Sequence, residues 1–156
     1  MPRIDLDRAP QVTGSRYPKP HDGPCAGRRA IRLGEAAGLT QFGVNLLTLD
    51  PGVWSSQRHW HSHEDEFVYV LSGEVVLVTD AGEETLRAGD AAGFKAGDRD
   101  GHCLQNRSTG PAQLLVVGSR HDDDHGEYSD IDMKFLPGRY SGKGGYRRKD
   151  ESEFEP

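Results

Sequence analysis

The chain has 156 residues, with 19 Lys and Arg against 25 Asp and Glu, and a net charge of −6 at pH 7. This acidic balance disfavours a dedicated nucleic-acid binder. No apolar stretch approaches the ~18 residues that a membrane span needs, so a transmembrane helix is excluded. Two cysteines are too few for a disulfide scaffold, and the first residues lack the apolar segment of a secretory signal. We therefore expect a cytoplasmic protein with reduced thiols.

Residues 1–28 contain five prolines and no hydrophobic period, so we expect an extended N-terminal arm. From 29 to 136, short runs rich in Val, Leu, Ile, Phe and Thr recur between Gly and Asp, and no longer segment has a helical period. This pattern predicts an all-β domain, a sandwich or a barrel. The predicted strands are 30–33, 41–50, 54–61, 66–72, 74–80, 83–87, 91–95, 102–106 and 112–119, with a weaker one near 127–135.

Two later segments look polar and irregular. Residues 137–156 combine several glycines with a basic run and an acidic end, which is typical of a flexible tail. Contact with a partner subunit is the alternative for this tail. The run His-Asp-Asp-Asp-His at 121–125 is interpreted as a solvated, charged connection. Its alternative is a second metal site, although the run lacks the spacing of a calcium loop.

The segment with the most chemistry begins at His59. On a strand, side chains two residues apart share a face and lie about 7 Å apart, so His59 and His61 could hold one cation. Glu66, after a bend, could close the site from below. A third imidazole must come from a distant strand, and His102 is the later histidine that lies in a strand-like run.

These residues also carry a family resemblance, because residues 52–106 resemble the cupin superfamily. Its first motif, G-x5-H-x-H-x3–4-E-x6-G, is matched by His59, His61, Glu66 and Gly73. Its second motif, G-x5-P-x-G-x2-H-x3-N, is matched by the segment from Gly89 through His102 to Asn106. Three departures occur: one extra residue before His59, Lys95 in place of Pro, and two extra residues before His102. They fall in turns, so we expect them to change loops and not ligands.

The resemblance implies a small antiparallel barrel of jelly-roll type over 29–136, with a single site. It also implies that His59, His61, Glu66 and His102 are the metal ligands. Three imidazoles and one carboxylate suit one divalent transition metal, namely Fe, Mn, Ni, Co or Zn, and the spacing does not choose among them. Four protein ligands leave two positions of a six-coordinate ion for water, a bidentate substrate or O₂.

Two further residues have open interpretations. His63 is a candidate acid or base, because imidazole titrates near neutral pH. Its alternatives are a partly exposed residue at the mouth of the site and a metal ligand. Asn106 lies four residues after His102 on the same strand face, where it could orient a ligand or end the strand. Trp60 alternates with the two histidines and is expected to point outward into packing contacts.

Three functions are compatible with this site. The first is a metal-dependent enzyme acting on a small polar substrate such as a sugar, a sugar phosphate or a hydroxy or keto acid, in the manner of an isomerase or epimerase. The second is an O₂-dependent dioxygenase, and the third is a non-catalytic small-ligand-binding or sensing domain. The expected partners are a small-molecule substrate and a second copy of the chain, because open β edges need protection. No nucleic-acid or membrane partner is expected.

Overall fold

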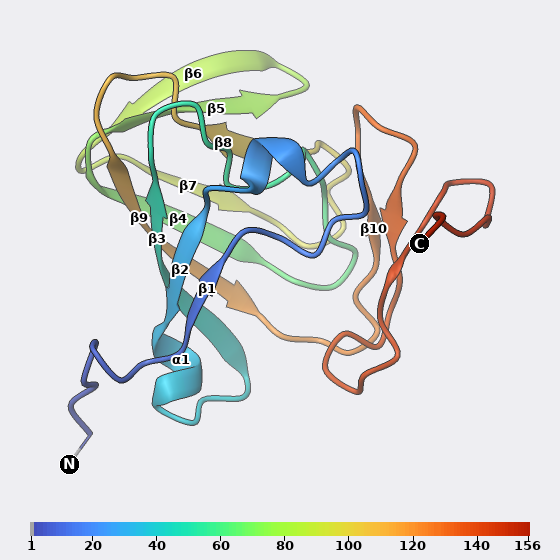
Figure 1. Cartoon of the computed structure of the whole chain (residues 1–156), viewed down its shortest axis with the longest axis horizontal. Coiled ribbons are helices and arrows are strands. Elements are labelled where there is room, and N and C mark those ends of the chain that lie inside the picture. Colours follow the sequence, from blue (N-terminus) through green and yellow to red (C-terminus); the bar gives the residue numbers. More distant parts are fainter. Residues whose placement is uncertain (1) are drawn as a thin grey trace.

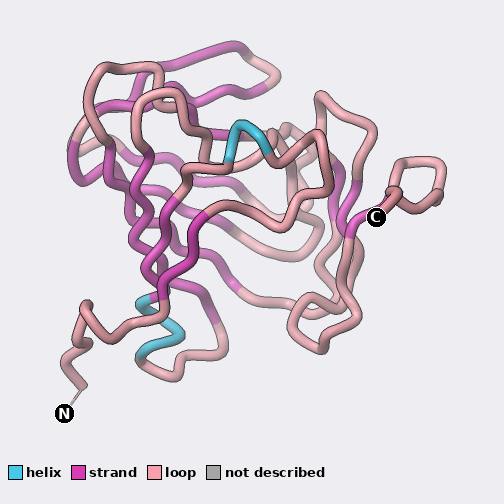
Figure 2. The backbone as a smooth tube through the Cα atoms, in the orientation of Figure 1, coloured by secondary structure: helices cyan, strands magenta, loops and turns pink. Residues whose placement is uncertain are grey.

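A computed structural model describes residues 2–156, which form strands and loops with two short helical turns (Figure 1, Figure 2). The helical turns are η1 (Gly23–Cys25) and α1 (Leu33–Ala36). The strands are β1 (Gln11–Thr13), β2 (Arg29–Arg32), β3 (Phe42–Leu49), β4 (Glu66–Ser72), β5 (Glu74–Thr79), β6 (Gly82–Arg87), β7 (Ala91–Phe94), β8 (Cys103–Gln105), β9 (Ala112–Ser119), β10 (Gly126–Glu127), β11 (Lys134–Phe135) and β12 (Tyr146–Arg147). The all-β prediction is confirmed.

Two antiparallel sheets face each other and enclose the core. The larger has the order β1-β2-β3-β9-β4-β7 and the smaller has the order β6-β5-β8. Strands far apart in sequence are neighbours, as when β9 pairs with both β3 and β4. The core side chains come from both sheets, and each buried aliphatic side chain contributes roughly 1.5–3 kcal/mol. They include Leu47, Leu49, Val68, Val70, Val75, Leu77, Leu86, Leu104 and Leu114.

One predicted strand, 54–61, is wrong. Here the structure has only isolated bridges, at Trp54 and His59. The backbone donors of this segment bond to several different segments in place of one ladder. The N–H of Ser55 donates to the Leu104 carbonyl, and the N–H of Trp60 donates to the Glu127 carbonyl. A segment shared among such partners cannot run as a regular strand, and its shape is set by long-range contacts.

The C-terminal residues form a third small sheet beside the barrel (Figure 1). In it β11 pairs with both β10 and β12. A second apolar cluster of Tyr128, Met133 and Phe135 lies there, and Tyr17 from the N-terminal segment and Phe154 pack against it. The segment 137–156, expected to be a flexible tail, thus lies against the domain. Within residues 2–156, neither helical turn has the length and hydropathy to cross a bilayer.

Candidate metal centre

Four predicted side chains meet between the two large sheets. Glu66 begins β4 of the six-stranded sheet, and His102 immediately precedes β8 of the other sheet. His59 and His102 exchange backbone hydrogen bonds of 3.2 and 2.9 Å, which brings His59 and His61 close to His102. His59 Nε2 lies 3.1 Å from His61 Nε2, and Glu66 Oε2 lies 2.9 Å from His102 Nε2 and 3.5 Å from His61 Nε2.

The hydrogen bonds of the Nδ1 atoms of His59 and His61 show where a cation fits. His59 Nδ1 donates to the Gln57 carbonyl at 2.8 Å, and His61 Nδ1 donates to the carboxylate of Asp124 at 2.7 Å. With Nδ1 protonated in both rings, the Nε2 lone pairs face each other across 3.1 Å. Two lone pairs at that distance repel unless a proton or a cation lies between them. Donor atoms of His59, His61 and Glu66 all lie within 4.8 Å of one another, and such a set of nitrogens and a carboxylate could hold a divalent transition ion.

The protonation states follow from burial and from these contacts. Burial, and then the neighbouring His102 and His61, lowers the pKa of His59 to about 3, so its imidazole is neutral at pH 7. Burial opposes ionisation of Glu66, but hydrogen bonds with His102 and His61 hold its pKa well below the usual range. Burial also disfavours the charged form of His61, but its bonds to Asp124 and Glu66 raise its pKa to about 9. A metal ion would therefore displace a proton from His61.

The late imidazole is held by an aromatic neighbour. The Phe94 ring stacks on His102 with 3.6 Å between ring centroids and 2° between ring planes. Phe94 pairs with Glu66 across β4 and β7, so one register contact places both groups at the site. The imidazole of His102 therefore faces His59 and Glu66, although two extra residues precede it compared with the family motif.

The interpretation of residues 121–125 as a solvated connection is wrong at Asp124. The side chain of Asp124 is completely buried, and it bonds to His61. Its neighbours on the run, Asp123 and His125, are exposed as expected. Asp124 lies 63 residues after His61, so no local spacing links the two. The acidic run was the signal in the sequence that could have indicated this carboxylate.

His63 lies outside the group of four. It is exposed, its Nδ1 lies 2.6 Å from the Ser62 hydroxyl, and its ring stacks on His121 at 4.8 Å between centroids. The structure thus brings His61, and not His63, to the other three side chains. A role for His63 as acid or base stays a prediction. Trp60 packs under the guanidinium of Arg99, 5.2 Å from the ring centroid.

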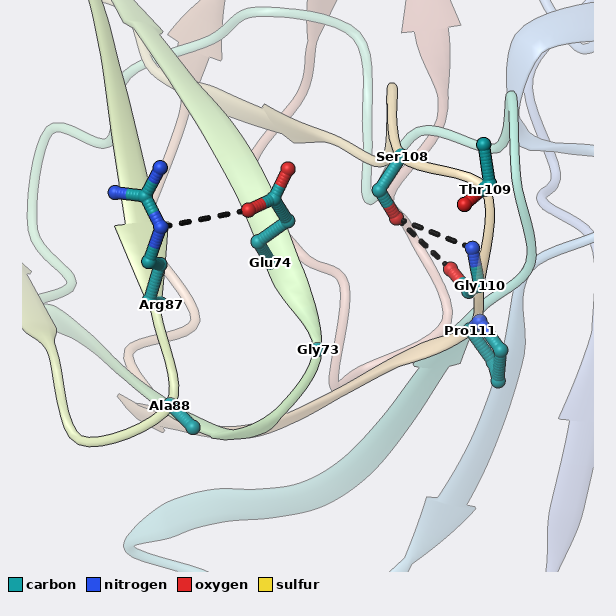
Figure 3. Close-up of a pocket in the computed structure, with 8 residues that line it drawn as sticks. All are labelled: Gly73, Glu74, Arg87, Ala88, Ser108, Thr109, Gly110 and Pro111. Atoms are coloured by element: carbon teal, nitrogen blue, oxygen red, sulfur yellow. Dashed lines mark hydrogen bonds and ion pairs between the residues drawn. The ribbon is translucent and has the colours of Figure 1, made fainter.

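Asn106 closes a turn at a place separate from the four side chains. Its fully buried amide donates to the carbonyls of Leu49 and Gly110, and its oxygen accepts from the backbone and the hydroxyl of Ser108. Ser108 and Gly110 of this turn line an open depression of about 480 Å³ together with Gly73. Figure 3 shows the residues around it. These contacts favour the interpretation in which Asn106 ends the strand.

Comparison with known proteins agrees with this architecture. Residues 45–118 match the family described as a cupin domain. The solved structure of a sugar phosphate isomerase from a cupin superfamily, from Silicibacter pomeroyi DSS-3, is 46% identical, with a TM-score of 0.92 over 99% of this chain and 97% of that chain. A putative sugar phosphate isomerase from Acidithiobacillus ferrooxidans is 29% identical, with a TM-score of 0.74 over 84% of this chain and 82% of that one.

A curated relative is more distant. The tetracenomycin polyketide synthase protein TcmJ of Streptomyces glaucescens is 28% identical over 87 residues, which are 56% of each chain. The chain thus matches about half the length of this relative. The match over nearly the whole Silicibacter structure carries the assignment: this chain belongs to the cupin superfamily.

Proposed function

We propose that the chain is a metal-dependent isomerase or epimerase that acts on a sugar phosphate. The observation that carries the proposal is the convergence of His59, His61, Glu66 and His102, with the Nε2 atoms of His59 and His61 3.1 Å apart and Glu66 Oε2 2.9 Å from His102 Nε2. The class of substrate rests on the 46% identity to a solved protein described as a sugar phosphate isomerase.

The four side chains would hold one divalent ion of Fe, Mn, Ni, Co or Zn. When bound, such an ion would polarise a carbonyl or hydroxyl oxygen of the substrate. The protein's own contribution is to keep His59 neutral and Glu66 ionised, the forms in which they can act as ligands. Phe94 holds the plane of His102. We propose His63, an exposed histidine two residues after His61, as the residue that moves a proton.

The test combines metal analysis with turnover. Purified protein is analysed for bound metals and incubated in D₂O with a panel of aldose and ketose phosphates, and NMR follows isomer formation and deuterium incorporation. We expect about one metal per chain and turnover that a chelator abolishes. His61→Ala should lose the metal, whereas His63→Ala should keep the metal and lose turnover.

Other outcomes would overturn the proposal. Turnover that survives complete metal removal would exclude the metal-dependent mechanism. Bound iron with substrate-dependent oxygen uptake would favour a dioxygenase. Tight binding of a sugar phosphate without turnover would favour a binding or sensing domain. Equal metal loss from His61→Ala and His63→Ala would show that the ligand assignment is wrong.

We also propose that two copies pair through the outer face of the six-stranded sheet. Phe67, Tyr69 and Leu71 project from β4 on the face opposite the core and are 43%, 37% and 45% exposed. Across the strands, Tyr69 lies beside Leu115, which lies beside Leu46, so apolar side chains cross the sheet. An apolar sheet face of this kind is self-complementary and suits a two-fold dimer.

The dimer is tested by light scattering coupled to size-exclusion chromatography. We expect twice the 17.2 kDa chain mass for the wild type and the monomer mass for Tyr69→Glu. Glu84→Lys, on an exposed position of the other sheet, is the control and should stay dimeric. A monomeric wild type at tens of micromolar would contradict the proposal.

A further inference from the structure

A second group of ionisable side chains touches the metal centre from outside. His61 Nδ1 lies 2.7 Å from Asp124 Oδ2 and 3.8 Å from Glu64 Oε2, and both carboxylates are buried. Asp124 belongs to residues 120–147, which follow β9 and contain β10, β11 and β12; we call them the C-terminal strap. This strap lies outside the residues that match the cupin domain.

The position of Asp124 is determined by more than its bond to His61. Its Oδ1 accepts from the backbone N–H groups of His63, at 2.9 Å, and Glu64, at 3.3 Å. The Ser62 hydroxyl donates to the same oxygen at 3.4 Å. Because the side chain is completely buried, no water competes for these donors. The carboxylate is therefore fixed against the backbone that follows His61.

Three groups of the strap contact this pair of carboxylates from the solvent side, and one of them, the Arg139 guanidinium, also neutralises charge. Arg139 Nη2 lies 2.5 Å from Glu64 Oε2 and 3.4 Å from Asp124 Oδ2. The Tyr140 hydroxyl donates to Glu64 Oε1 at 2.6 Å, and the backbone N–H of His121 donates to the same oxygen at 3.1 Å. A guanidinium thus occupies the place where a cation would otherwise join the two carboxylates. This group is an ion-pair network and not a second metal site.

We propose that Asp124 is a positioning residue of the metal centre and that the C-terminal strap holds it there. The carboxylate fixes the His61 ring and keeps hydrogen on Nδ1, so that the lone pair of Nε2 faces His59 and Glu66. A carboxylate that accepts from the outer nitrogen of a ligand histidine also raises the basicity of the inner one. This inference rests on the proposed function only in requiring that the four side chains bind a metal.

The consequence is that metal affinity depends on residues far from the ligands in sequence. Removing a partner of this kind typically weakens metal binding by about 10- to 100-fold. Asp124→Asn keeps the size of the side chain but removes its charge. Asp123→Asn makes the same charge change on the adjacent exposed residue, so it is the matched control.

Metal-free full-length protein is titrated with Co²⁺ and with Zn²⁺ in competition with a chromogenic chelator, and the visible spectrum of the Co²⁺ form is recorded. We expect Asp124→Asn to lose about 10- to 100-fold in affinity and to shift the Co²⁺ bands. Asp123→Asn should stay within about twofold of wild type with an unchanged spectrum. A purely structural role would lower the melting temperature of Asp124→Asn but leave its spectrum and affinity unchanged, and that result would overturn the inference.

A second variant covers the case in which Asp124→Asn does not fold. Arg139→Gln leaves the bond between Asp124 and His61 but removes the cation that holds the carboxylates. We expect an intermediate loss of affinity that Arg139→Lys restores in part, and wild-type affinity in Arg139→Gln would overturn the role of the strap. The failures are distinguishable: if the wild type binds neither metal, the proposed function fails. If the wild type binds and these variants bind equally well, only this inference fails.

Discussion

Replacing Asn106 by alanine tests whether this residue builds the turn or serves the metal site. The amide donates to the Leu49 carbonyl at 2.7 Å and to the Gly110 carbonyl at 2.9 Å. Its oxygen accepts from the backbone N–H of Ser108 at 2.9 Å and from the hydroxyl at 2.7 Å. Asn106→Ala removes these four hydrogen bonds and leaves a space that the methyl group cannot fill.

The expected cost follows from which partners water can reach. Leu49 is completely buried, so its carbonyl loses a donor that solvent does not replace, at about 1–3 kcal/mol. The Gly110 carbonyl keeps the Ser108 hydroxyl as a donor, and Ser108 is partly exposed, so these groups add only about 1 kcal/mol. We expect the free energy of unfolding to fall by about 2–4 kcal/mol, which most domains of this size survive.

Urea unfolding followed by far-UV circular dichroism measures this change in metal-free protein. Ser108→Ala, which removes only the hydroxyl contacts, is the control and should cost less than about 1 kcal/mol. Metal affinity of Asn106→Ala, measured at a temperature where it is folded, should equal that of the wild type. A stability loss below about 0.5 kcal/mol, or a tenfold loss of metal affinity with normal stability, would refute the reasoning.

Three further predictions concern the strap, the metal and the thiols. A Cβ on Gly126 would overlap the carbonyl oxygen of Trp60, so Gly126→Ala should lower the melting temperature by several degrees; Gly145→Ala, with open space around it, should not, and equal melting temperatures for the two variants would contradict this. Removal of the metal by a chelator should lower the melting temperature by roughly 5–10 °C relative to protein with metal at about 100 times its Kd, and an unchanged melting curve would count against a bound metal. Burial raises the pKa of Cys25 to about 12 and also raises that of Cys103, so at pH 8 both stay protonated; a thiol reagent should label neither cysteine until guanidinium unfolds the chain, and rapid labelling of the native protein would disprove their burial.

The sequence predicted those features that depend on local periodicity. The short apolar runs at 66–72 and 112–119 predicted β4 and β9 with the bounds that the structure has. The motif spacing also predicted four side chains that the structure brings close together, because the placement of side chains two residues apart, or set by strand register, depends on short-range geometry. The resemblance to the cupin superfamily rested on the same residues.

Tertiary structure alone decided what surrounds those four side chains. Segment 54–61 was predicted to be a strand but bends, since its hydrogen-bond partners come from several parts of the chain. Asp124 lies in an acidic run of the kind that is usually exposed to solvent. It is nevertheless completely buried, because Arg139 and backbone N–H groups compensate its charge. Local pattern carries no information on such compensation, since each partner is supplied by a segment that only the completed fold brings near.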